Sequence, residues 1–87
     1  MEVICKVMEV GNLTQITTAS GNNLPKIEVL LGVGQHQILA GAFDKEAAAI
    51  ASSTIDKDAL YVADLAFSVS GSDKKFQNVR LTHLSLF

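Results

Sequence analysis

The chain has 87 residues, of which 48% are hydrophobic and 18% charged, and its formal net charge is −2. This length fits one domain over residues 1–87, and the hydrophobic content excludes a disordered chain. The acidic balance also excludes a broadly basic nucleic-acid binder, so any basic surface must be local.

Cys5 is the single cysteine, so the chain can form neither an internal disulfide nor a cysteine-rich zinc site. Met1–Val10 alternates polar and apolar residues and lacks the pattern of a signal segment. No apolar run approaches the roughly 20 residues that span a bilayer. We therefore expect a soluble, cytoplasmic protein.

The first third of the chain predicts strands. Residues Glu2–Ala19 alternate with period two and contain β-branched residues, and they predict one long strand that bends at Gly11-Asn12, or two nearly continuous strands. The Gly/Asn-rich Ser20–Asn23 predicts a turn. In Lys26–Gly32 the apolar residues Ile27, Val29 and Leu31 alternate with polar ones, which predicts a second strand with one buried face.

A third strand is predicted for Gln35–Phe43, after a turn at Gly32–Gly34. Because a strand follows this Gly-x-Gly, a hairpin turn explains it better than a phosphate-binding loop does. The Ala-rich Phe43–Ser53 then predicts the single short helix, with Asp44 as its N-cap and Ile50 and Phe43 as its apolar anchors.

Two more strands are predicted after the helix. The first lies within Asp56–Gly71, where Tyr61 and Phe67 share a face that favours the core. A charged turn at Ser72–Lys75 leads to the last strand, Phe76–Phe87, whose alternation shifts register near Thr82–His83.

The expected fold is therefore all-β. Five strands with one short helix between the third and fourth match the five-stranded Greek-key barrel called the OB-fold, in which the helix closes one end of the barrel. A four-stranded sheet with a packed helix, an α+β fold, is the alternative.

Three segments give the chain a resemblance to a known family. "MEVICKVMEVGNL", "ILAGAFDKEAAAIA" and "LYVADLAFSVS" followed by "FQNVRLTHLSLF" resemble the bacterial single-stranded DNA-binding protein superfamily, in particular its short relatives that include primosomal replication protein N. The resemblance implies a non-catalytic role in DNA replication, repair or recombination, a homodimer or higher oligomer, and a groove in which bases stack on aromatic rings.

The candidate nucleic-acid-binding residues are basic or aromatic. Arg80 shares one face of the last strand with Asn78 and Phe76, a stripe that suits stacking and phosphate pairing. The further candidates are Lys6, Lys26, Lys74 and Lys75 for phosphates and Tyr61 for stacking. An ordinary solvated residue is the commoner explanation for Lys6, Lys74 and Lys75, and Lys26 is expected to be exposed in either case.

Other polar residues favour structural roles. His36 and His83 are far apart, so we expect no metal site and no cofactor. Cys5 alternates with valines, which predicts an inert thiol in the core. Phe43 is expected to be a core anchor beneath the helix. We expect no enzymatic activity.

A second hypothesis is a structural or protein-interaction domain that assembles through an apolar outer face containing Ile4 and Met8. The absence of Trp and the net negative charge favour it.

Overall fold

The computed structural model describes the backbone of residues 1–70 and 76–87 and the side chains of residues 1–67 and 79–87. Its elements, in chain order, are β1 (Glu2–Val10), β2 (Thr14–Thr17), β3 (Asn23–Val33), β4 (His36–Phe43), α1 (Asp44–Ser52), β5 (Tyr61–Ser70) and β6 (Phe76–Leu86). The predicted turn at Ser72–Lys75 lies outside the described residues.

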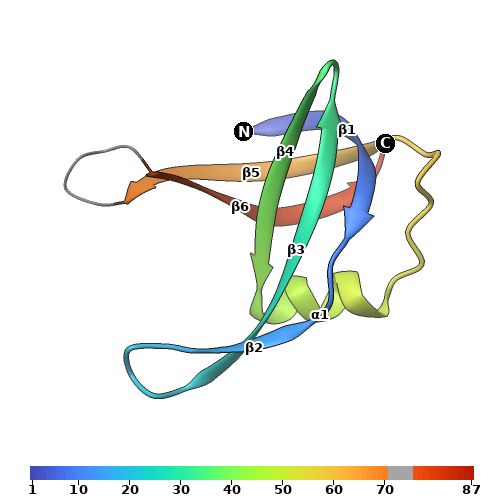
Figure 1. Cartoon of the computed structure of the whole chain (residues 1–87). Coiled ribbons are helices and arrows are strands. Elements are labelled where there is room, and N and C mark those ends of the chain that lie inside the picture. The colour runs from blue at the N-terminus through green and yellow to red at the C-terminus, as the bar shows by residue number, and fades with distance from the viewer. Residues whose placement is uncertain (71–75) are drawn as a thin grey trace.

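The strands form one sheet in the order β1-β5-β6-β4-β3-β2, and β1 also pairs with β3, which closes the sheet into a barrel. All neighbours are antiparallel except β4 and β6, which meet in a parallel pairing at Gly41 and Arg80. In Figure 1, the β3–β4 hairpin crosses in front of β5 and β6. This is the predicted all-β OB-fold, with its helix between the third and fourth strands of the five-strand count.

Of the two forms predicted for the first segment, the structure has two strands, β1 and β2, which accounts for the sixth strand. The break includes Gly11, whose amide donates a hydrogen bond of 2.8 Å to the carbonyl of Glu28 on β3. A Cβ on Gly11 would lie only 3.0 Å from that carbonyl oxygen, so only glycine lets the two backbones approach so closely here. The chain therefore bends at the predicted residue.

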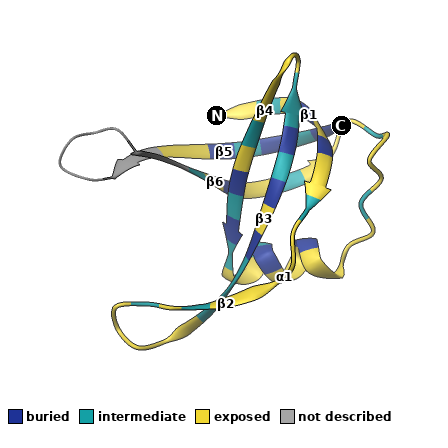
Figure 2. Cartoon of the chain, in the orientation of Figure 1, coloured by how far each residue is buried: buried dark blue, intermediate teal, exposed yellow. Residues whose placement is uncertain are grey.

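The core lies inside the barrel and largely follows the predicted alternation (Figure 2). The expected core position of Phe67 is wrong: its side chain is 42% exposed, because it lies toward the end of β5 that extends beyond the barrel (Figure 1). Small alanines on β4 and β5 leave room for branched side chains from the facing strands. The buried residues are Cys5, Val7, Ile27, Val29, Leu31, Ala40, Ala42, Ala47, Ile50, Tyr61, Ala63, Leu65 and Leu81.

Helix α1 packs against β3, β4 and β6 through the buried Ala47 and Ile50. The predicted N-cap, Asp44, is wrong. Phe43 is the extended N-cap residue, with no side-chain cap hydrogen bond, and Asp44 is the first helical residue. Asp44 has a φ of 56°, and aspartate tolerates this left-handed conformation better than most residues. The chain thus turns sharply from β4 into the helix.

The predicted register shift in the last strand is confirmed. Asp64 pairs with His83 but Leu65 pairs with Leu81, so Thr82 is an extra residue on β6. The Thr82 hydroxyl donates a hydrogen bond of 3.0 Å to the carbonyl of Asp64. This bulge keeps Leu81 buried and Arg80 exposed on the outer face.

Candidate nucleic-acid interface

The outer face of the barrel carries an aromatic ring between two cations. Phe43, the last residue of β4, is half-buried and faces outward because its neighbour Ala42 is buried. Lys26 of β3 is its cross-strand partner. The Lys26 Nζ and the Arg80 Cζ each lie over the ring, 5.5 Å from its centroid. We call Lys26, Phe43 and Arg80 the Phe43 cluster.

The two cations reach the ring from opposite neighbours of β4. Lys26 belongs to β3, and Arg80 belongs to β6, where it pairs with Gly41. Because both distances lie within the range of cation–π attraction, the ring and the charges hold one another in place. Two positive charges therefore lie over Phe43 although the whole chain is acidic.

Gly41 lies next to the ring, and Glu28 lies next to Lys26. A Cβ on Gly41 would lie 3.6 Å from both the Phe43 ring and the Lys26 Cε, so these two side chains lean over the glycine. Glu28 is the cross-strand partner of Gly41. Its Oε1 lies 3.8 Å from the Lys26 Nζ, and its side chain is 52% exposed.

The Phe43 cluster lies between two hairpins. Lys26 pairs with Thr14 of β2, and Arg80 pairs with Ala66 of β5. In Figure 1, the β2–β3 hairpin and the paired β5 and β6 both extend beyond the barrel to the left. The arrangement offers a ligand a floor on β3, β4 and β6 with a strand pair on each side.

The structure brings two of the predicted phosphate-binding residues, Lys26 and Arg80, together at one aromatic ring. Lys6 is exposed on β1, where it pairs with Gly32. Gly32 lies four positions along β3 from Glu28, about 13 Å for an extended strand. Lys6 is therefore on the outer surface but outside the cluster.

Tyr61 is a correction to the predicted site. Its side chain is only 6% exposed, and its hydroxyl accepts a hydrogen bond of 3.0 Å from the amide of Asp56. A buried ring with an occupied hydroxyl presents no face to a base. Its place in the core follows the alternation that also buries Ala63 and Leu65.

Two predicted residues, Phe76 and Asn78, lie toward the other end of the β5–β6 pair. They lie on β6, opposite Ser70 and Ser68, but their side chains are outside the described part. Lys74 and Lys75 lie outside the described residues altogether. Their proposed contacts remain predictions.

Phe43 and Glu28 are the residues that sequence reasoning missed. Phe43 reads as a core anchor because it precedes the helix. However, Ala40 and Ala42 are the buried residues of β4, and the same alternation places Leu39, Gly41 and Phe43 outside. The alternation of this segment was therefore the signal in the sequence that could have placed Phe43 on the outer face. Glu28 was expected to face outward, but its place opposite Gly41 depends on the strand register.

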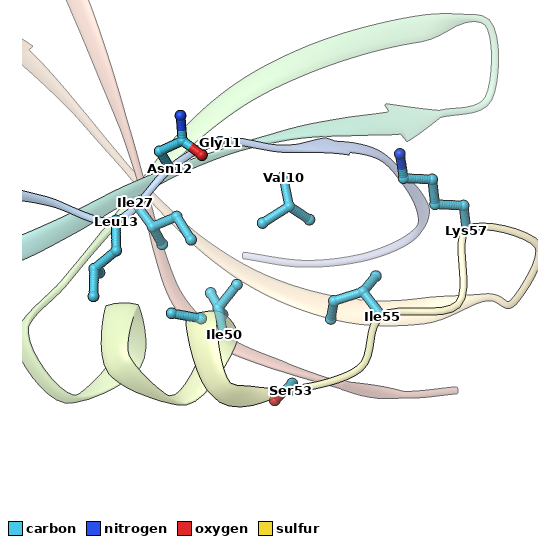
Figure 3. Close-up of a pocket in the computed structure, with 10 residues that line it drawn as sticks. Val10, Gly11, Asn12, Leu13, Ile27, Ile50, Ser53, Ile55 and Lys57 are labelled. Atoms are coloured by element: carbon cyan, nitrogen blue, oxygen red, sulfur yellow. The ribbon is translucent and has the colours of Figure 1, made fainter.

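A separate hollow of about 470 Å³ lies where β1 ends beside α1 (Figure 3). Its lining is mainly apolar and includes Val10, Ile27, Ile50 and Ile55, with Lys57 at its rim. None of the predicted site residues whose side chains the structure describes lines it.

The Cys5 thiol, possible metal ligands and helix lengths add three findings. Cys5 is 2% exposed, and burial raises the pKa of its thiol above the ordinary value of 9.0, which confirms it as a core residue. Among the described residues, no three His, Cys, Asp or Glu side chains are grouped so that they could hold a metal ion. That part of the chain likewise has no helix long and apolar enough to cross a membrane.

Comparison with known proteins gives a likeness of fold. No protein-family model matches the sequence, and no curated protein does. Among solved structures, the chain is similar to the second OB-fold domain of replication protein A from Methanococcus maripaludis. The TM-score is 0.71 over 98% of this chain and 80% of that domain's chain, at 7% sequence identity.

Proposed function

We propose that this domain binds single-stranded nucleic acid, DNA foremost, through the Phe43 cluster and without catalysis. The observation that carries the proposal is the outward-facing Phe43 ring between Lys26 and Arg80, because stacking on an aromatic ring and pairing with phosphates are the two components of single-strand binding. The OB-fold, which the chain shares with a domain of replication protein A, supports a role inside the cell in replication, repair or recombination.

The ring would accept a base by exchange. In the free protein, both cations lie over the ring, so a base that stacks there takes the place of one of them. The displaced cation pairs with the phosphate beside that base. The second cation holds the next part of the backbone, since the two charges are at most twice 5.5 Å apart.

The test is the fluorescence anisotropy of a labelled, mixed-sequence single-stranded oligonucleotide at low salt. We expect binding by the unmodified protein and a loss of roughly 5- to 150-fold in Phe43→Ala, because stacking contributes about 1–3 kcal/mol per base. Phe87→Ala is the matched control, since Phe87 is 73% exposed and outside the cluster.

Circular dichroism would detect a folding defect of Phe43→Ala. Arg80→Ala is a second variant of the cluster, and because Arg80 is exposed its removal should leave the fold intact. Absence of binding at low salt would overturn the proposal. Equal affinities of Phe43→Ala and Phe87→Ala would show that the ligand lies elsewhere.

The second candidate function is assembly into homo-oligomers, and exposed apolar side chains favour it. Ile4 and Met8 on β1 are 50% and 42% exposed, and Leu39 on β4 is 58% exposed. Multi-angle light scattering should then give a dimer that Met8→Glu converts to a monomer, whereas Leu13→Glu, at a position 45% exposed at the hollow beside α1, leaves the dimer intact. A monomer at high concentration would contradict this candidate.

A further inference from the structure

A carboxylate beside a phosphate-binding surface is electrostatically unfavourable, and Glu28 is such a carboxylate. It faces outward from β3, between the buried Ile27 and Val29, and is 52% exposed. A nearby phosphate would be repelled by it. Glu28 is therefore either a cost to binding or a group that contacts a different part of the ligand.

Glu28 is free to contact a ligand. Its described ion-pair partner is Lys26, at a distance of 3.8 Å, which is long for a charged hydrogen bond. Such a pair is weak at an exposed site, and Lys26 also interacts with the Phe43 ring. A ligand can therefore separate the two at little cost.

The strand register places Glu28 and Arg80 on either side of Gly41, which has no side chain. Glu28 pairs with Gly41, and Gly41 pairs with Arg80, so the three residues form a row across β3, β4 and β6. Two strand spacings separate the Glu28 and Arg80 backbones by about 10 Å. The Phe43 ring contacts the Gly41 position from the next outward-facing residue of β4. A base held by the ring thus has a hydrogen-bond acceptor on one side and a donor on the other.

Guanine fits this pair of groups best. Its Watson–Crick edge presents two adjacent N–H donors, N1–H and N2–H, which a carboxylate accepts together, and its O6 and N7 accept from an arginine. Adenine and cytosine present one amino donor beside a ring acceptor. Thymine and uracil present one N–H between two carbonyl oxygens, which repel a carboxylate.

We propose that Glu28 selects guanine in a single strand bound at the Phe43 cluster. The proposal rests on the proposed function, since it needs a base on the ring. Glu28 acts by accepting two hydrogen bonds from the base, and Arg80 donates to its opposite edge or to the adjoining phosphate. The ligand class is thereby narrowed to guanine-containing single strands.

The experiment compares labelled oligo-dT strands of one length that carry a single central dG, dI, dA or dC. Anisotropy titrations use the unmodified protein, Glu28→Gln and the matched control Glu2→Gln, which removes the same charge from β1. We expect the dG strand to bind roughly 5- to 150-fold more tightly than oligo-dT. The dI strand, which lacks the N2 amino group, should lose most of that preference.

The readout is the ratio of the affinities for the dG oligonucleotide and for oligo-dT. Removing a negative charge raises the affinity for every oligonucleotide, and the ratio cancels this general gain. Glu28→Gln should abolish the dG preference, and Glu2→Gln should keep it. Equal affinities for dG and oligo-dT in the unmodified protein would overturn the proposal while leaving the proposed function standing. If Glu28→Gln raises the affinity for every oligonucleotide by the same factor, so that the ratio of the dG and oligo-dT affinities is unchanged, Glu28 only repels phosphates and the proposal fails. If no strand binds at all, the proposed function itself fails.

Discussion

Gly11 shows how a single position holds the barrel together. Its amide bonds to the Glu28 carbonyl at 2.8 Å, and a Cβ would lie 3.0 Å from the same oxygen. We predict that Gly11→Ala lowers the free energy of unfolding by about 1–3 kcal/mol, since two backbones must separate to admit one methyl group. Urea denaturation followed by circular dichroism measures this.

Gly41→Ala is the matched control at the residue scale. The nearest atoms to its added methyl group lie at 3.6 Å, an ordinary contact distance, and both belong to side chains. Its stability should change by no more than about 0.5 kcal/mol. Equal losses in the two variants would contradict the role given to Gly11.

Individual side chains also show the limit of reasoning from sequence. The alternation of β4 and β5 contains enough information to place Phe43 outside and Tyr61 inside. The row of Glu28, Gly41 and Arg80 cannot be derived in that way, because it depends on which strands pair and in which register. Those pairings join residues that are far apart in the chain, and local patterns do not encode them.

At the scale of elements, the sequence predicted most of the architecture. Period-two alternation located the strands, and the Ala-rich segment located α1, because both patterns are local. The extra residue at Thr82 was also predicted from the sequence, because the alternation of apolar and polar residues in the last strand shifts by one position there. The details of the junctions were less accessible. Phe43 rather than Asp44 is the N-cap, because β4 stays extended up to the helix.

The hairpins are the elements with the most direct bearing on the site. Lys26 and Arg80 lie where the β2–β3 and β5–β6 pairs leave the barrel. Sequence reasoning centred the ligand on the last hairpin, with Lys6 and Lys26 as further phosphate contacts. The structure adds β3 and β4 as the floor, and so moves the centre of the candidate site to Phe43.

At the scale of the whole molecule, the net charge of −2 limits the electrostatic part of binding. If Lys26 and Arg80 each neutralise one phosphate, the logarithm of the binding constant should fall with the logarithm of salt with a slope of about −1.4. Lys26→Ala and Arg80→Ala should each make the slope shallower by about 0.7. Titrations at several salt concentrations measure the slopes.

Lys57→Ala is the control for this prediction, because Lys57 is an exposed lysine beside the separate hollow. It should leave the slope unchanged. A steeper slope that persists in Lys26→Ala and Arg80→Ala would show that other cations, such as the predicted Lys6, Lys74 and Lys75, carry the phosphate contacts.

The double pairing of β1 has a consequence for how the chain acquires its shape. The first half of β1 pairs with β5 and the second half with β3, so β1 is synthesised more than fifty residues before the strand that pairs with its first half. Contacts between residues so far apart in the sequence are slow to form, and barrels dominated by such contacts fold in milliseconds to seconds. A nascent chain that ends before Tyr61 lacks the partner of Glu2–Cys5, so the barrel closes in one late, cooperative step.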